Sequence, residues 1–130
     1  MKVAINGMGR IGRAAFKVIL ETPELELVAV NDISAIGDIV YLIRRDSVYG
    51  RYDRKTEHSD TEINVEGRII RFYSEKDPAK IPWKEHNVDV VFECSGVFTD
   101  KKALQKHLDA GAKKVLLSAP PKGEGVPLSI

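Results

Sequence analysis

A glycine-rich turn between an apolar run and a helix-like segment is the feature that most constrains this chain. Residues 2–6 form a short apolar run ending in a polar residue, and Gly7-Met-Gly9-Arg-Ile-Gly12 follows at once. Glycines at this spacing let a chain turn sharply out of a strand, approach a pyrophosphate closely and pack a helix against a sheet. The helix start offers free N–H groups and a positive dipole end to the phosphates. The pattern therefore predicts a dinucleotide-binding site.

The acidic residue Asp32 strengthens this prediction. A second apolar run, residues 25–31, ends at Asp32, which lies 20 positions beyond Gly12. A dinucleotide-binding unit places a carboxylate at about this distance, where it binds ribose hydroxyls. Because a carboxylate repels the 2′-phosphate of NADP, Asp32 favours NAD as the cofactor.

The rest of the chain alternates helix and strand patterns. Helical spacing after Gly12 predicts a first helix, and similar spacing over residues 36–43 predicts a second. Buried strands are expected at 88–92 and 113–118, with a helix between them. The apolar face of the first helix is expected to contain Ala14, Ala15, Val18 and Ile19.

Glu66-Gly67 marks a hairpin between residues 61–65 and 68–73. The charged stretch 51–60 is interpreted as a solvated connection, because it shows little apolar periodicity. Together these patterns predict an α/β fold of the Rossmann type, a doubly wound and mainly parallel sheet with an antiparallel hairpin insertion.

Ligands in such sheets bind beyond the carboxyl ends of the strands. The glycine turn, Asp32, Ser95-Gly96 and Ser118 are all predicted to lie at such ends. Four separate segments are thus expected to converge on one crevice.

Composition limits the other possibilities. The chain has 130 residues, 43% of them hydrophobic and 30% charged, as expected for one globular domain. Its 20 basic and 19 acidic residues give a net charge of +1, which does not favour nucleic acid as a partner. No apolar run suits a membrane span and no signal peptide is evident, so we expect a cytoplasmic protein. Cys94 is the only cysteine, which excludes an internal disulfide, and no metal site is expected.

Several runs resemble the opening half of phosphorylating glyceraldehyde-3-phosphate dehydrogenases. The most similar is Ala4-Ile-Asn-Gly-Met-Gly-Arg-Ile-Gly-Arg13. The others are Val30-Asn-Asp32, Asp46-Ser-Val-Tyr-Gly50, Phe92-Glu-Cys-Ser-Gly-Val-Phe-Thr99 and Ala110-Gly-Ala-Lys-Lys-Val-Leu-Leu-Ser-Ala-Pro120. The resemblance covers essentially the whole chain.

The resemblance and the fingerprint together imply a set of NAD-binding residues. These are Gly7, Gly9, Arg10, Ile11, Gly12, Asn31, Asp32, Lys76, Ser95, Gly96 and Ser118. By the likeness, Arg10 and Ile11 offer backbone N–H groups to the pyrophosphate, and Asp32 binds the adenosine ribose. Lys76, where the family usually has arginine, would lie by the adenine. Ser95, Gly96 and Ser118 would line the path toward the nicotinamide.

The resemblance also implies what the chain does. The family oxidises glyceraldehyde 3-phosphate to 1,3-bisphosphoglycerate with NAD and inorganic phosphate, through a cysteine thiohemiacetal and thioester and with a histidine as base. Its Ser-Cys-Thr-Thr-Asn nucleophile segment does not occur in these 130 residues. We therefore expect residues 1–130 to be a truncated NAD-binding domain without its catalytic domain, able to bind NAD but inactive alone. The parent protein is expected to be a homotetramer.

Two other functions stay open at this stage. Erythrose-4-phosphate dehydrogenase shares the N-terminal pattern, and a stand-alone nucleotide-binding module would also fit; a nucleic-acid role through the cofactor groove has no support from charge. The remaining chemically active side chains are not expected to be catalytic. Cys94 is interpreted as a packing residue and Trp83 as a core anchor, whereas His58, His86 and His107 are interpreted as surface residues.

Overall fold

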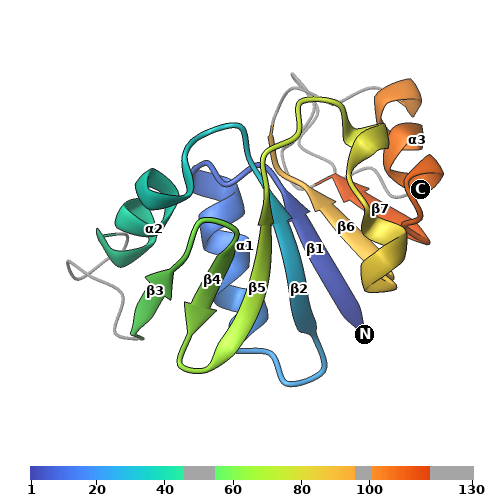
Figure 1. The fold of residues 1–130 in the computed structure, drawn as a ribbon. Helices are drawn as coiled ribbons and strands as arrows, with labels where there is room; N and C mark the ends of the chain where they lie inside the picture. Colours follow the sequence, from blue (N-terminus) through green and yellow to red (C-terminus); the bar gives the residue numbers. More distant parts are fainter. Residues whose placement is uncertain (46–54, 96–100, 118–130) are drawn as a thin grey trace.

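The computed structural model describes residues 1–45, 55–95 and 101–117 (Figure 1). The first half contains β1 (Lys2–Asn6), α1 (Arg10–Leu20), β2 (Glu26–Asn31), α2 (Ile36–Arg45), β3 (Thr56–His58) and β4 (Glu62–Val65). The second half contains β5 (Arg68–Tyr73), the 3-10 helices η1 (Pro78–Lys80) and η2 (Trp83–His86), β6 (Val90–Glu93), α3 (Lys101–Asp109) and β7 (Lys114–Leu117).

The described strands form one sheet in the order β3-β4-β5-β2-β1-β6-β7. Neighbours from β5 through β2, β1 and β6 to β7 are parallel, and the pairs β3–β4 and β4–β5 are antiparallel. This confirms the predicted Rossmann-type α/β fold with an antiparallel insertion.

The connections place a topological switch point between β1 and β6. The chain leaves β1 through α1 and returns as β2 on one side of β1, whereas β6 and β7 extend the sheet on the other side. Ligands of open α/β sheets bind where the strand order reverses in this way. The carboxyl ends of β1 and β6 are therefore the first place to look for a site.

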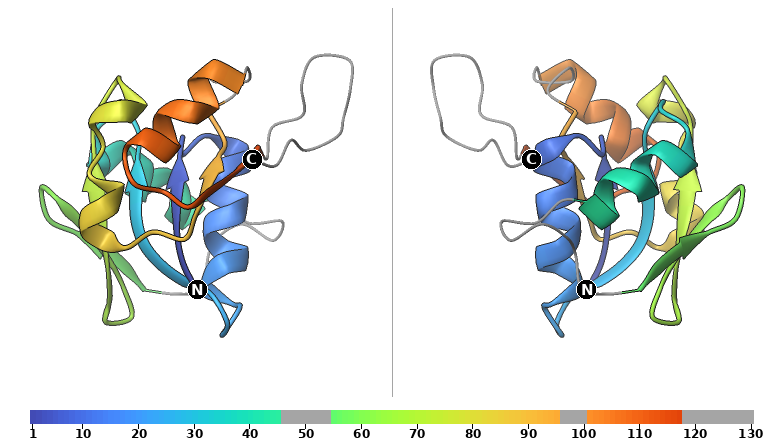
Figure 2. Two further views of the ribbon diagram at one scale, coloured as in Figure 1. Left: turned by 90° about the vertical axis from the view of Figure 1, so that its right-hand side faces the viewer. Right: turned by 90° about the vertical axis from the view of Figure 1, so that its left-hand side faces the viewer.

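Helical layers cover the two faces of the sheet, as Figure 2 shows. Side chains of β1 pack against both helical layers, because successive side chains of a strand point to opposite faces of the sheet. Val3 and Ile5 belong to the core cluster that contains the buried residues of α1 and α2. Ala4 belongs to a second cluster, on the face of η1 and η2, with Trp83. Trp83 is fully buried, which confirms it as a core anchor.

The hairpin follows its turn chemistry. Glu66 and Gly67 have φ of 52° and 92°, as a two-residue turn with positive φ at both positions requires. The side-chain oxygen of Asn64 accepts a hydrogen bond from the Gly67 N–H at 2.8 Å. The predicted hairpin is thereby confirmed, with β4 and β5 paired in antiparallel register.

Two local predictions were wrong in part. Ile19 is buried in α1 as predicted, and Ala15 packs against the core. Ala14 is exposed and Val18 is 64% exposed, and Phe16 and Leu20 complete the buried face instead. The aromatic ring buries more apolar area than the alanine and valine positions, so it decides which side of the helix faces the sheet. The stretch 51–60 also contains a strand, β3, which pairs with β4 through backbone hydrogen bonds and therefore needs little side-chain alternation.

Candidate functional site

The glycine turn is pressed against the end of β6. Gly7 has φ of 97°, and a Cβ placed on it would lie 2.5 Å from the Cα of Ser95. A Cβ on Gly12 would lie 1.8 Å from the carbonyl oxygen of Gly7. Neither position has room for a side chain, so these two glycines allow β1, α1 and β6 to meet at the switch point.

Gly9 is different, because a Cβ placed on it would meet no atom within 4 Å. It precedes α1, and the first hydrogen bond of that helix runs from the Arg13 N–H to the Gly9 carbonyl at 2.8 Å. Arg10 and Ile11 lie in the exposed first turn, where N–H groups have no partner within the helix. The open space over Gly9 and these donors suit an anionic group such as a pyrophosphate.

Asp32 lies beside this turn and is fixed by the backbone. Its Oδ2 accepts a hydrogen bond from the Met8 N–H at 2.6 Å, and its Oδ1 accepts one from the Ser34 N–H at 2.8 Å. A carboxylate offers about four acceptor positions, so roughly two are left for a ligand. Asp32 thus pins the glycine turn and presents further acceptors for hydroxyl groups.

Asn31 holds the loop after β5 rather than pointing into open space. It is 3% exposed, and its side-chain amide brackets the backbone of Glu75, donating to the carbonyl at 3.0 Å and accepting from the N–H at 2.8 Å. This contact places exposed Lys76, the next residue, beside the end of β2. The two segments that the sequence assigns to the adenosine end are therefore adjacent.

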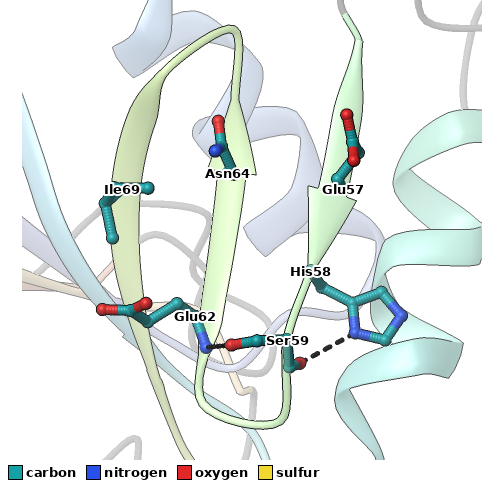
Figure 3. A pocket seen from close by; sticks show the side chains of 6 residues that line it. All are labelled: Glu57, His58, Ser59, Glu62, Asn64 and Ile69. Carbon is teal, nitrogen blue, oxygen red and sulfur yellow. Dashed lines mark hydrogen bonds between the residues drawn. The ribbon is translucent and has the colours of Figure 1, made fainter.

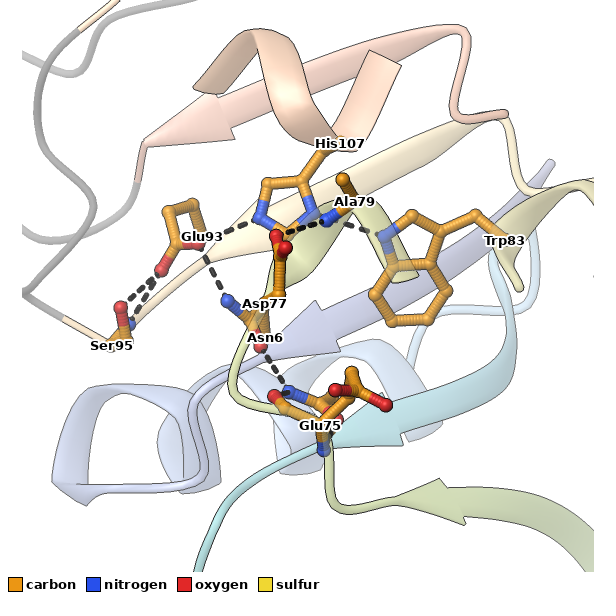
Figure 4. Close-up of polar contacts among 9 residues, drawn as sticks. Asn6, Glu75, Asp77, Ala79, Trp83, Glu93, Ser95 and His107 are labelled. Atoms are coloured by element: carbon orange, nitrogen blue, oxygen red, sulfur yellow. Dashed lines mark hydrogen bonds and ion pairs between the residues drawn. The ribbon is translucent and has the colours of Figure 1, made fainter. Parts of the chain in front are cut away.

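Ser95 is held by Glu93 at the end of β6. The Glu93 Oε2 accepts hydrogen bonds from the Ser95 N–H at 2.9 Å and from the Ser95 hydroxyl at 2.6 Å (Figure 4). Its Oε1 accepts from the Asn6 amide at 2.7 Å. Gly96 and Ser118, also predicted for this site, lie outside the described residues.

His107 is not a surface residue, contrary to the sequence interpretation. It is 0% exposed, and its Nε2 lies 2.7 Å from the Glu93 Oε1 while Trp83 donates its indole N–H to Nδ1 at 3.0 Å. Figure 4 shows the imidazole between these two side chains. A buried histidine is tolerated here because both ring nitrogens have partners. Its spacing of three positions from Leu104, which is also buried, is the sequence signal that indicates a core-facing helix position.

The other two histidines lie nearer the surface. His58 is exposed, as expected, and His86 is half-buried with its Nε2 in a hydrogen bond with the Tyr73 hydroxyl at 2.6 Å. Burial lowers the pKa of His86, and the nearby Arg71 lowers it further. Cys94 is 6% exposed within the core cluster of α1, in agreement with its interpretation as a packing residue.

A shallow depression of about 230 Å³ lies at the β3 edge of the sheet (Figure 3). Its lining comes from β3, β4, β5 and the turn between β3 and β4, and consists of Glu57, His58, Ser59, Glu62, Asn64 and Ile69. It is separated from the switch point by β2, and none of the predicted cofactor residues lines it. Nothing in it matches the chemistry predicted from the sequence.

Within residues 1–45, 55–95 and 101–117, histidine, cysteine and acidic side chains form no cluster of three suited to a metal ion. The helices in the same ranges are too short or too polar to cross a bilayer.

Known proteins resemble this chain over most of its length. Residues 1–101 match the family model described as glyceraldehyde 3-phosphate dehydrogenase, NAD binding domain. A glyceraldehyde-3-phosphate dehydrogenase of Thermotoga maritima is 42% identical over 99% of this chain and 39% of its own length. Glyceraldehyde-3-phosphate dehydrogenase 3 of Saccharomyces cerevisiae is 46% identical over 92% of this chain and 36% of its own length. Glyceraldehyde-3-phosphate dehydrogenase 2 of Streptomyces avermitilis is 44% identical over 97% of this chain and 38% of its own length. The chain thus spans 36–39% of the length of these relatives.

Proposed function

This chain belongs to the family of glyceraldehyde-3-phosphate dehydrogenase NAD-binding domains, and we propose that it supplies the cofactor site of such an enzyme. NAD is the cofactor of the family. The parent reaction is proposed to be the NAD- and phosphate-dependent oxidation of glyceraldehyde 3-phosphate to 1,3-bisphosphoglycerate. The names of the three relatives favour this substrate over erythrose 4-phosphate.

One observation carries the proposal. The open space over Gly9 lies at the switch point of the sheet, and Asp32 is hydrogen-bonded to Met8 within the same turn. The N–H donors proposed for the phosphates and the carboxylate proposed for the ribose are therefore adjacent and fixed relative to each other. This is the combination that a dinucleotide needs and that an incidental glycine loop lacks.

In this proposal each residue contacts a different part of the cofactor. The pyrophosphate lies over Gly9 and accepts hydrogen bonds from the N–H groups of Arg10 and Ile11. Asp32 accepts hydrogen bonds from the adenosine ribose hydroxyls. Lys76 lies by the adenine, and Ser95 lies on the nicotinamide side. NAD itself supplies the hydride acceptor of the dehydrogenase reaction.

The chain alone is proposed to bind NAD without oxidising an aldehyde. The family's Ser-Cys-Thr-Thr-Asn segment is not among its 130 residues, and Cys94 is buried in the core. The parent protein is proposed to be a cytoplasmic homotetramer, in keeping with the family resemblance and the single cysteine.

Calorimetric titration of the purified chain with NAD and NADP tests the proposal. We expect saturable NAD binding, weaker NADP binding, and weaker NAD binding by Asp32→Ala. The Ala variant should also show a smaller difference between NAD and NADP, because the charge that repels the 2′-phosphate is gone. Asp60→Ala, at an exposed turn of the hairpin region, is the matched control and should bind as the wild type does. Equal affinity of wild type and Asp32→Ala for NAD, or aldehyde oxidation by the pure chain, would contradict the proposal.

A further inference from the structure

Three side chains form a polar ladder across the carboxyl ends of the central strands. Asn31, Asn6 and Glu93 are the last residues of β2, β1 and β6, and Asn6 is in register with both of the others. The Asn31 amide donates to the Asn6 Oδ1 at 2.7 Å, and the Asn6 amide donates to the Glu93 Oε1 at 2.7 Å. Each of the three side chains is at most 3% exposed. The ladder therefore lies buried beneath the proposed cofactor site.

The ladder ends at groups whose hydrogen-bond direction cannot be reversed. At one end the Glu75 backbone donates to Asn31 through N–H and accepts through its carbonyl, which fixes the orientation of the Asn31 amide. At the other end the Trp83 indole N–H can only donate, so the Nδ1 of His107 accepts and its proton lies on Nε2. The Ser95 backbone N–H can also only donate.

These fixed hydrogen-bond directions determine which side chain suits position 93. Asn6, His107 and Ser95 all present N–H donors to it, and Ser95 adds its hydroxyl. Both oxygens of the side chain must therefore accept. A glutamine cannot do so, because it presents an NH2 group on one side. The four donors satisfy both buried oxygens of Glu93, as buried polar atoms require.

We propose that Glu93 is a positioning residue of the NAD site, which fixes the Ser95 backbone at the switch point and links that site to His107 of α3 and, through it, to Trp83 of η2. This inference rests on the proposed function and deepens it. Glu93 itself has no contact with solvent, so it acts on the cofactor only through the residues it holds.

The Glu93→Gln variant indicates which hydrogen bond of the ladder would break first. With its NH2 group at the Oε1 position the glutamine would face the N–H groups of Asn6 and His107, which makes two donor–donor conflicts. With the NH2 group at the Oε2 position it would face one backbone N–H, that of Ser95, whose hydroxyl can rotate to accept. Ser95 is also the most exposed of these partners, so it can move toward solvent. The defect is therefore expected at the cofactor crevice.

Calorimetric titration with NAD tests the inference. We expect Glu93→Gln to weaken NAD affinity by about tenfold while the chain stays folded, since one buried hydrogen bond is lost. Glu26→Gln is the matched control, because Glu26 is exposed at the amino end of β2 and belongs to no part of the ladder; its affinity should equal that of the wild type. Unchanged NAD affinity in a folded Glu93→Gln variant would overturn the inference.

A second measurement is made first on the wild type, where it does not depend on the variant folding, and then on the Glu93→Gln variant. Trp83 is the only tryptophan, and its indole N–H makes the last hydrogen bond in the series that runs from Ser95 through Glu93 and His107. In a nitrogen–proton NMR correlation spectrum, NAD should shift this single indole resonance, and the shift should be absent in NAD-saturated Glu93→Gln. A wild type that binds NAD with no indole shift would overturn the inference alone. A wild type that does not bind NAD would overturn the proposed function, and this inference with it.

Discussion

Replacing Gly9 or Gly12 by alanine should separate cofactor binding from folding. At Gly9 the backbone has φ of −74° and ψ of −162°, which alanine adopts, and the added methyl group meets no protein atom within 4 Å. Alanine is a poorer helix N-cap than glycine, so we expect the free energy of unfolding to fall by no more than about 1 kcal/mol. The same methyl group would occupy the proposed pyrophosphate position.

The loss of NAD affinity in Gly9→Ala follows from the donors it blocks. Moving the phosphates away from the N–H groups of Arg10 and Ile11 removes two hydrogen bonds to a charged group, each worth about 1.5–3 kcal/mol. We therefore expect NAD affinity to fall on the order of 100-fold or more.

Gly12→Ala should behave in the opposite way. Its Cβ would lie 1.8 Å from the backbone oxygen of Gly7, so α1 must move away from the turn. Overpacking of this kind costs about 1–3 kcal/mol or more, and the better helix propensity of alanine returns only about 1 kcal/mol. We expect a loss of roughly 2 kcal/mol in the free energy of unfolding.

Urea denaturation and NAD titration of both variants decide the matter. Gly9→Ala that binds NAD as tightly as the wild type would show that the pyrophosphate does not lie over Gly9. Gly12→Ala as stable as the wild type would show that Gly12 is not packed against Gly7 as closely as the structure has it.

Three further predictions concern stability. Burial and Arg71 lower the pKa of His86, so the unfolded state binds a proton more readily than the folded state, and the free energy of unfolding should fall as the pH falls below about 6.5. His86→Gln should reduce this pH dependence in urea titrations at several pH values. An unchanged pH dependence would contradict the role given to His86. Gly67→Ala should cost about 1–2 kcal/mol, because φ is 92° but the space around it is open. Gly111→Ala should cost more, because φ is 116° and its Cβ would lie 2.5 Å from Lys84; equal unfolding midpoints for the two glycine variants would contradict this ranking.

Features that depend on local backbone chemistry were predictable from the sequence. Gly7 and Gly67 require positive φ, and each marks its turn without knowledge of the rest of the fold. Asp32 was identified by its distance from the glycine turn, and the structure adds that it also accepts a hydrogen bond from Met8. Its role toward ribose stays a prediction.

Features that depend on strand register were not predictable in the same way. Asn6 and Glu93 are 87 positions apart, and only the register of β1 against β6 brings their side chains together. His107 was interpreted as a surface residue because its sequence neighbours are charged, whereas a distant indole and carboxylate satisfy both its nitrogens. Polar residues at the ends of adjacent parallel strands therefore need a structure before their partners can be named.

The most direct test of the central claim is a crystal structure of this chain with NAD bound. The account predicts the pyrophosphate over Gly9 at the start of α1, with the adenosine ribose hydroxyls hydrogen-bonded to the carboxylate of Asp32. NAD bound elsewhere, for instance in the depression beside His58, or seated at the switch point without contact to Asp32, would contradict it.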